Sequence, residues 1–249
     1  MNEEYSLARD YHENSKSIPS ARPFNPNTHY KIYPAAKAIP MEKNDSDTEQ
    51  QDSFIQTLLA RKSTRAFSPK NINLSTLSQL LTLSFGLRSS EDNIQHRTYA
   101  SAGARYPIEV YIAIMQSDDI EHGIYHYNIA DNSLELIKVG EYSEKIKDFY
   151  KNQETIITTD YPCMILFSMV FDRPMEKYGE RGYRFALLDA GHMSQNLYLV
   201  ATHFGLGVVA LGAGGESDDR IDDIIGLVHG EENVFYSFAV GHPSKDIKG

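Results

Sequence analysis

The sequence predicts one globular domain that combines helices with β-strands and follows a separate N-terminal arm. The chain has 249 residues, 41% of them hydrophobic, which is enough to bury one sizeable core. Apolar residues recur at helical spacing in some segments and form short continuous runs in others, which indicates both helices and strands. The start of the chain is much more polar. We therefore assign residues 1–52 to an arm and residues 53–249 to one domain without internal repeats.

The arm is rich in residues that favour turns. It ends in a polar stretch from Glu42 to Asp52, and its prolines are Pro19, Pro23, Pro26, Pro34 and Pro40. This composition favours an extended arm that wraps a surface, or partly disordered chain, over a packed helix.

Two helices are expected at the start of the domain. Apolar residues of the segment 54–59 lie at helical spacing, and a second apolar stripe runs from Leu74 to Phe85 and ends at Gly86. The segment Arg61–Phe67 between them is a cationic joint in an acidic protein.

Strands are expected next. The segments Val110–Met115, Gly123–Tyr127 and Leu134–Val139 have strand composition, and the turn-like residues 130–133 predict that the last two form a hairpin. The segment Met164–Phe171 is an almost unbroken apolar run, which is typical of a strand covered on both faces. We therefore place it in the centre of the sheet.

The last third of the chain predicts the longest helix and the end of the sheet. Apolar residues repeat at helical spacing between Arg184 and Phe204, and Gly205 is a helix stop. The remaining elements are a strand at Val208–Leu211, a short helix near Ser217–Leu227 and a last strand near Val234–Val240.

Charge and cysteine content exclude several kinds of partner and site. The formal net charge of −10 argues against binding to nucleic acid or anionic membranes, both of which need a cationic surface. Cys163 is the only cysteine, so neither an intrachain disulfide nor a cysteine metal cluster can form. No segment reaches the roughly 18 apolar residues of a membrane span, and the amino terminus does not resemble a signal peptide. We expect a soluble, cytoplasmic protein.

The joint between the first two helices carries a candidate phosphate site. Arg61, Ser63 and Arg65 occupy alternate positions, so in an extended segment their side chains project to one side. Guanidinium groups bind phosphate oxygens with charge-assisted hydrogen bonds, and the hydroxyl can donate one more. The alternative is a solvated basic turn.

Two further segments could contact a flat ligand. The loop Arg97–Pro107 consists mainly of small residues, which permit close backbone approach, although tight packing would need the same residues. The glycine cluster at 212–215 does not match a dinucleotide fingerprint, and the carboxylates that follow it would repel a pyrophosphate. Its backbone amides could still meet a neutral heteroaromatic ring.

Lys177 and Tyr178 lie between the predicted central strand and the longest helix, at a sheet end where sites tend to form. They could supply a proton acceptor and a hydrogen-bond donor if burial or a neighbouring cation made the ammonium give up its proton. The alternative is a solvated surface pair.

A metal site is not expected. The pairs His122/His126 and His192/His203 have spacings that do not bring two ring nitrogens to one ion, and neither pair has an evident carboxylate partner.

Taken in order, segments of this chain resemble the SagB-type dehydrogenases, or thiazole/oxazole oxidases, of the nitroreductase family. The matching segments are Tyr11–Lys16, Tyr30–Pro34, Arg61–Phe67, Ser101–Tyr111, Gly123–Tyr127, Lys177–Arg184 and Gln195–Leu197. Two positions depart from the family pattern: Ala100 stands where a proline is usual, and Arg105 stands where an aliphatic residue is common and could alter a substrate or flavin contact.

The resemblance implies an α+β nitroreductase-like fold, with a central, mainly antiparallel sheet wrapped by helices. It also implies a homodimer with one flavin mononucleotide (FMN) in each of two interface sites. By position, Arg61, Ser63 and Arg65 would bind the phosphate, the ribityl chain or the polar edge of the ring. The residues that would approach the flavin ring are Ser101, Ala102 and Gly103 from the partner chain, and Leu211, Gly212, Ala213 and Gly214 near its N5 side.

The function implied by the resemblance is oxidation of thiazoline or oxazoline rings to thiazole or oxazole in a peptide or carrier-bound substrate. Our hypothesis is that a hydride passes to the flavin N5, that Lys177 assisted by Tyr178 takes the ring proton, and that O₂ reoxidises the FMN. A cyclodehydratase or synthetase is a possible partner. Two alternatives stay open: an NAD(P)H-dependent nitro or quinone reductase of the same fold, and a non-catalytic subunit of a peptide-modifying complex.

Overall fold

The computed structural model describes residues 6–16, 53–88, 96–142, 145–146, 157, 159–211 and 216–244. The helices are α1 (Ser6–Ser15), α3 (Ser53–Ala60), α4 (Leu74–Phe85), α6 (Asp172–Tyr178), α7 (Arg181–His203) and α8 (Glu216–Ile225), with a 3-10 turn η1 (Ala102–Ala104). The strands are β1 (Leu87–Arg88), β2 (His96–Arg97), β3 (Ile108–Ile114), β4 (Gly123–Asn128), β5 (Ser133–Val139), β6 (Cys163–Val170), β7 (Gly207–Leu211) and β8 (Glu232–Gly241).

One six-stranded sheet organises the domain, in the order β5-β4-β3-β6-β8-β7, and β1 and β2 form a separate pair. Every pairing within the six strands is antiparallel. The predicted hairpin is confirmed as β4 and β5, and the predicted central strand is confirmed as β6, which is almost completely buried between β3 and β8. The α+β class with a mainly antiparallel sheet is therefore confirmed.

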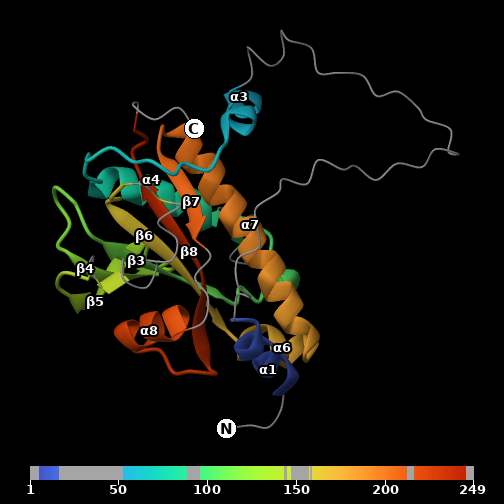
Figure 1. Ribbon diagram of the computed structural model, residues 1–249. Coiled ribbons are helices and arrows are strands. Elements are labelled where there is room, and N and C mark those ends of the chain that lie inside the picture. The colour runs from blue at the N-terminus through green and yellow to red at the C-terminus, as the bar shows by residue number, and fades with distance from the viewer. Residues whose placement is uncertain are drawn as a thin grey trace, which may run out of the picture.

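Helices cover both faces of this sheet (Figure 1). On one face, Val110 and Phe167 belong to a core that includes the apolar sides of α4 and α7. On the other face, Met164 and Leu166 pack in a second core with Ile221 of α8. Alternate residues of β6 thus enter different cores, which explains its unbroken apolar sequence.

The longest helix is α7, as expected, and α4 ends at Gly86 as expected. Asn73 caps α4, because its side-chain oxygen accepts a hydrogen bond from the Thr76 backbone N–H at 2.9 Å. The predicted first helix is also present as α3, but none of its residues is buried in the single chain. Phe54, Leu58 and Leu59 are among its exposed side chains.

Two helices were not expected. Residues Ser6–Ser15 form α1, with Ala8 and His12 buried, so the preference for extended chain over helix is wrong for this part of the arm. The physical reason is that all the prolines of the arm lie beyond residue 18, which leaves α1 free of helix breakers. The segment before α7 also contains a short helix, α6. The domain boundary at residue 52 stays a prediction.

Among the described residues, no helix combines the length and the apolar character needed to cross a membrane.

Candidate active site

The loop that follows β2 has an unusual backbone. The backbone φ values are 59° at Gly103, 53° at Ala104 and 46° at Tyr106. They lie in the left-handed region, which residues other than glycine rarely adopt. Such conformations persist only where the surroundings hold them, and they occur often at functional sites.

Asp189 of α7 holds this loop in place. Its carboxylate accepts hydrogen bonds from the Ser101 hydroxyl at 2.5 Å and from the Ala102 backbone N–H at 3.3 Å. Only 3% of Asp189 is exposed, and burial raises the pKa of its carboxyl group. The Ser101 oxygen also accepts a hydrogen bond from the Tyr106 N–H at 2.9 Å. The hydroxyl of Ser101 therefore shapes the loop from within.

Sequence reasoning missed Asp189. The available signal was a carboxylate between Leu188 and Ala190, inside the segment predicted as an apolar helix. A charged residue is seldom buried without a partner, so this position predicted a polar contact to another segment.

Lys177 and Tyr178 meet the loop at Gly103. A Cβ atom at Gly103 would overlap the Tyr178 hydroxyl and would lie 2.6 Å from Lys177 Nζ. The Lys177 Nζ also lies 5.3 Å from the centre of the Tyr178 ring, and that ring packs edge-on against Phe185 at 4.9 Å. The fold thus brings the predicted catalytic pair and the predicted Ser101–Gly103 segment together within one chain.

Arg105 takes part in this arrangement by contacting α6. Its Nε donates a hydrogen bond to the Arg173 carbonyl at 2.6 Å, and its Nη2 lies 2.5 Å from Glu176 Oε2. Arg173 in turn donates to the Tyr106 carbonyl at 3.1 Å and pairs with Glu109. Arg105, one of the two positions that depart from the pattern described above, therefore connects the loop to α6 by a hydrogen bond and an ion pair.

The candidate phosphate segment is attached to the edge strand β7. Ser63 forms a parallel bridge with Val208, and the Thr64 N–H donates to the Val208 carbonyl at 2.9 Å. The backbone here is extended, as expected, so the side chains of Ser63 and Thr64 point in opposite directions. The Thr64 side chain is buried. The Arg61 guanidinium lies 5.6 Å from the centre of the Tyr198 ring of α7.

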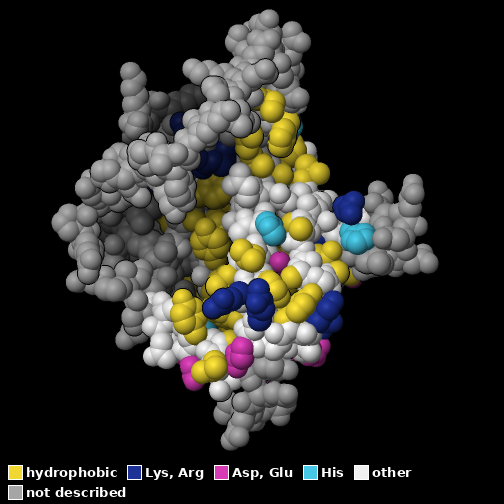
Figure 2. Space-filling model, turned by 90° about the vertical axis from the view of Figure 1, so that its right-hand side faces the viewer, with side chains coloured by type: hydrophobic (Ala, Val, Ile, Leu, Met, Phe, Trp, Pro, Cys, Tyr) yellow, Lys and Arg dark blue, Asp and Glu magenta, His cyan; other side chains and the backbone are white. Residues whose placement is uncertain are grey.

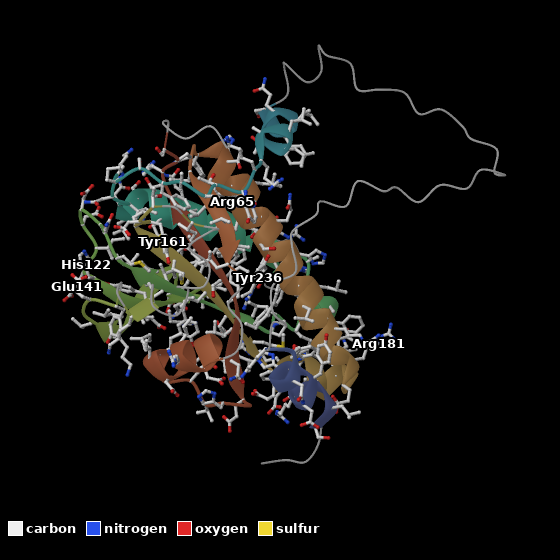
Figure 3. The ribbon with its side chains drawn as sticks, in the orientation of Figure 1. Arg65, His122, Glu141, Tyr161, Arg181 and Tyr236 are labelled. Carbon is white, nitrogen blue, oxygen red and sulfur yellow. The ribbon has the colours of Figure 1, made fainter. Side chains whose placement is uncertain are left out.

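Within one chain, the two groups of candidate residues lie toward opposite ends of α7. Asp189 contacts the loop, whereas Tyr198 contacts Arg61, and nine residues of helix span about 14 Å. Figure 3 shows Arg65 and Arg181 near opposite ends of the same helix. Leu211 is the buried last residue of β7, and Gly212, Ala213 and Gly214 lie outside the described residues.

The histidines considered as metal ligands have separate partners. His122 contacts Glu141 (Figure 3), and His126 contacts Glu109 and Glu135 at 3.0 and 2.9 Å. His192 faces the Ala100 carbonyl at 3.0 Å, and His203 packs edge-on against Phe204.

Potential metal-binding atoms of Asp219, Asp222 and His229 lie within 4.8 Å of one another in the described part of the chain. The Lys16 ammonium lies 2.6 Å from Asp219 and already supplies a positive charge there. Asp222 accepts hydrogen bonds from Asn233 at 2.8 Å and from the Val234 N–H at 2.7 Å, and burial raises its pKa to about 6. These contacts attach α8 to the start of β8.

Comparison with known proteins identifies relatives of this chain. The nitroreductase family model matches residues 58–242. A protein of Methanocaldococcus jannaschii described as a nitroreductase is 31% identical over 63% of this chain and 76% of its own length. The microcin B17-processing protein McbC of Escherichia coli is 30% identical over 56% of this chain, and the trifolitoxin-processing protein TfxB of Rhizobium leguminosarum is 32% identical over 43%. The matches span only 52% of McbC and 29% of TfxB.

Solved structures agree with the fold. The E. coli microcin synthetase McbBCD complex with truncated pro-MccB17 bound contains a chain with a TM-score of 0.72 and 22% identity, covering 97% of this chain and 87% of that one. A nitroreductase-like protein of Anabaena variabilis has a TM-score of 0.64 and 26% identity, covering 77% of this chain and 38% of the other.

Proposed function

The chain belongs to the nitroreductase family, and from that premise we propose that it is a SagB-type, FMN-dependent dehydrogenase that oxidises azoline rings of a peptide to azoles. One observation carries the proposal: Lys177 Nζ and the Tyr178 hydroxyl lie directly against Gly103, in a loop with a strained backbone. A proton acceptor and a hydroxyl are thereby held where a flat ring could approach the loop.

The residues around β7 suit an FMN phosphate. Arg61, Ser63 and Arg65 offer two guanidinium groups and a hydroxyl along one extended segment, in a chain whose net charge is −10. The bridge from Ser63 to Val208 fixes the backbone that carries these donors before any ligand arrives. When bound there, FMN would supply the acceptor for the hydride that an azoline ring loses.

The separation of the two residue groups supports a homodimer. Figure 2 shows hydrophobic side chains gathered on the face of the molecule that carries α3 and α7. Exposed apolar residues here are Phe54, Leu58 and Leu59 of α3, Leu187 and Leu188 of α7, and Phe204 just after α7. Apolar patches of this kind mark interaction surfaces. A second copy with its α7 antiparallel to the first would bring Lys177 of one chain toward Arg61 of the other.

Lys177 and Tyr178 have different roles in the proton transfer. Lys177 takes the acidic proton from the azoline ring, and Tyr178 orients the ring or the lysine nitrogen through its hydroxyl. Lys177 is exposed in the single chain, so the substrate and the second subunit would have to exclude water from it. Molecular oxygen is the final electron acceptor.

The curated relatives support a peptide substrate. McbC and TfxB carry names that describe them as processing proteins for microcin B17 and trifolitoxin. One solved structure that covers 97% of this chain is that of the microcin synthetase McbBCD complex with truncated pro-MccB17 bound. A cyclodehydratase-type partner that forms the azoline ring is therefore part of the proposal.

Mass spectrometry of a peptide containing a preformed thiazoline tests the proposal. Incubation with the FMN-loaded protein and air should remove two hydrogens per ring, whereas Lys177→Ala should keep the yellow flavin and lower turnover by roughly 10²- to 10⁴-fold. Arg61→Ala should instead lose flavin absorbance during purification. Rapid oxidation of NADPH with a quinone, and no change in the peptide, would assign the chain to the reductase alternative. A colourless protein that refuses added FMN would favour the non-catalytic alternative.

A further inference from the structure

We propose that helix α1 is a brace that positions Lys177 and Tyr178 by holding α6 at both of its ends. This inference rests on the catalytic role proposed above for the pair. Helix α1 lies outside residues 58–242, which the family model matches. Figure 1 shows α1 beside α6 and the start of α7.

The first contact lies just beyond the end of α6. The Glu180 carboxylate accepts hydrogen bonds from the backbone N–H groups of Leu7 and Ala8, at 3.1 and 2.7 Å. A carboxylate at the amino terminus of a helix satisfies free N–H groups and interacts favourably with the helix dipole. Only Gly179 separates Glu180 from Tyr178, so this contact holds the chain immediately after the catalytic pair.

The second contact lies at the start of α6. Arg9 of α1 reaches Asp172, the first residue of α6, with an Nη2–Oδ1 distance of 2.9 Å. The Arg9 Nε donates a hydrogen bond to the Gly230 carbonyl at 2.7 Å. One helix thus contacts the segment 172–180 at its beginning and at its end.

The brace is itself firmly attached to the domain. His12 is buried, with Nδ1 3.2 Å from the Tyr183 hydroxyl and its ring edge-on to Phe171 at 5.3 Å. At the far end of α1, the Lys16 ammonium pairs with Asp219 of α8 at 2.6 Å, and only 8% of the lysine side chain is exposed. Movement of α1 would therefore break contacts to three other elements.

A short helix such as α6 needs such contacts. Helices of fewer than about 12 residues are marginal by themselves, and α6 has seven. On its other side, α6 is linked to the Ser101–Pro107 loop through Arg105. Without the contacts to α1, Lys177 would stay covalently connected to β6 through α6, but its side chain would no longer be held against Gly103. Glu180 and Arg9 are accordingly positioning residues.

The experiment compares Glu180→Ala, Glu180→Gln and Arg9→Ala in the full-length, FMN-loaded protein, with Asp10→Ala as the matched control. Asp10 is an exposed carboxylate on the same helix and has no side-chain hydrogen bond or ion pair among the described residues. Competitive labelling with acetic anhydride, read by mass spectrometry, measures the reactivity of Lys177 relative to exposed Lys70. Hydrogen exchange of residues 6–16 reports whether α1 is loosened.

Glu180→Ala and Arg9→Ala should each speed hydrogen exchange of α1, change the relative labelling of Lys177 at least threefold and lower kcat by about 10- to 100-fold, with KM and flavin content unchanged. Glu180→Gln should recover part of both effects, because its amide oxygen still accepts a hydrogen bond. Asp10→Ala should match the unaltered protein. Faster exchange of α1 with unchanged Lys177 labelling in both alanine variants would overturn the inference. If no form of the protein oxidises an azoline, the proposed function fails, but labelling and exchange still decide whether α1 positions Lys177.

Discussion

Gly103→Ala perturbs the candidate site at the point where the loop meets the proposed catalytic pair, Lys177 and Tyr178. The new Cβ atom would overlap the Tyr178 hydroxyl and lie 2.6 Å from Lys177 Nζ, well inside ordinary contact distance. Both atoms are the ends of long side chains, so they can move away by about 1 Å without disturbing the core. A displacement of that size at a reacting group typically lowers the rate by about 10²-fold.

The substitution also lowers stability through the backbone, and a control variant separates this effect from the displacement. Gly103 has φ of 59°, where an L-amino acid costs about 1 to 2 kcal/mol. For a chain of this size, that cost lowers Tm by roughly 2 to 8 °C. Gly205→Ala is the matched control, because Gly205 has φ of 69° but no atom within 4 Å of the added Cβ.

The assay measures Tm by circular dichroism, flavin content by absorbance, and azoline oxidation by mass spectrometry for both variants. Both should lose similar stability and keep FMN, and only Gly103→Ala should lose about 100-fold in turnover. If turnover of Gly103→Ala stays within twofold of that of Gly205→Ala, contact with Gly103 does not set the working position of Lys177.

Three further predictions concern residues around the site. Asp189→Asn should lower stability by about 1 to 3 kcal/mol, seen as a lower Tm, because the amide cannot accept from both Ser101 and Ala102 with the same geometry; an unchanged Tm would contradict the anchoring role. Arg105→Leu should lower the free energy of unfolding by only about 1 kcal/mol, seen as a small decrease in Tm, because its ion pair is partly exposed. It should lower turnover by less than tenfold. Burial, and to a smaller extent the nearby Lys16 charge, lowers the pKa of His12 from 6.5 to about 4. The folded protein therefore gains about 3 kcal/mol of stability from neutral His12. This contribution is complete above pH 6.5 and is lost as the pH falls toward 4. His12→Gln should therefore flatten the decrease of Tm between pH 7 and pH 4.5, and equal slopes would refute this account.

Local patterns in the sequence were sufficient to locate most of the fold. Continuous apolar residues marked β6, helical spacing marked α4 and α7, and glycines marked the helix ends. These features could be predicted because each depends on the conformation and burial of neighbouring residues. The motif around Arg61 and the pair Lys177–Tyr178 could also be selected from residue types alone.

What these residues contact was decided only by the tertiary structure. Ser101 meets Asp189 across 88 residues of sequence, and Leu7 meets Glu180 across 173. Such contacts depend on the order of the strands and on the faces that helices present, which no local pattern determines. The sequence therefore determined which side chains could do chemistry, and packing of distant segments around one sheet determined that Lys177 and Tyr178 face Gly103 and that α1 braces them.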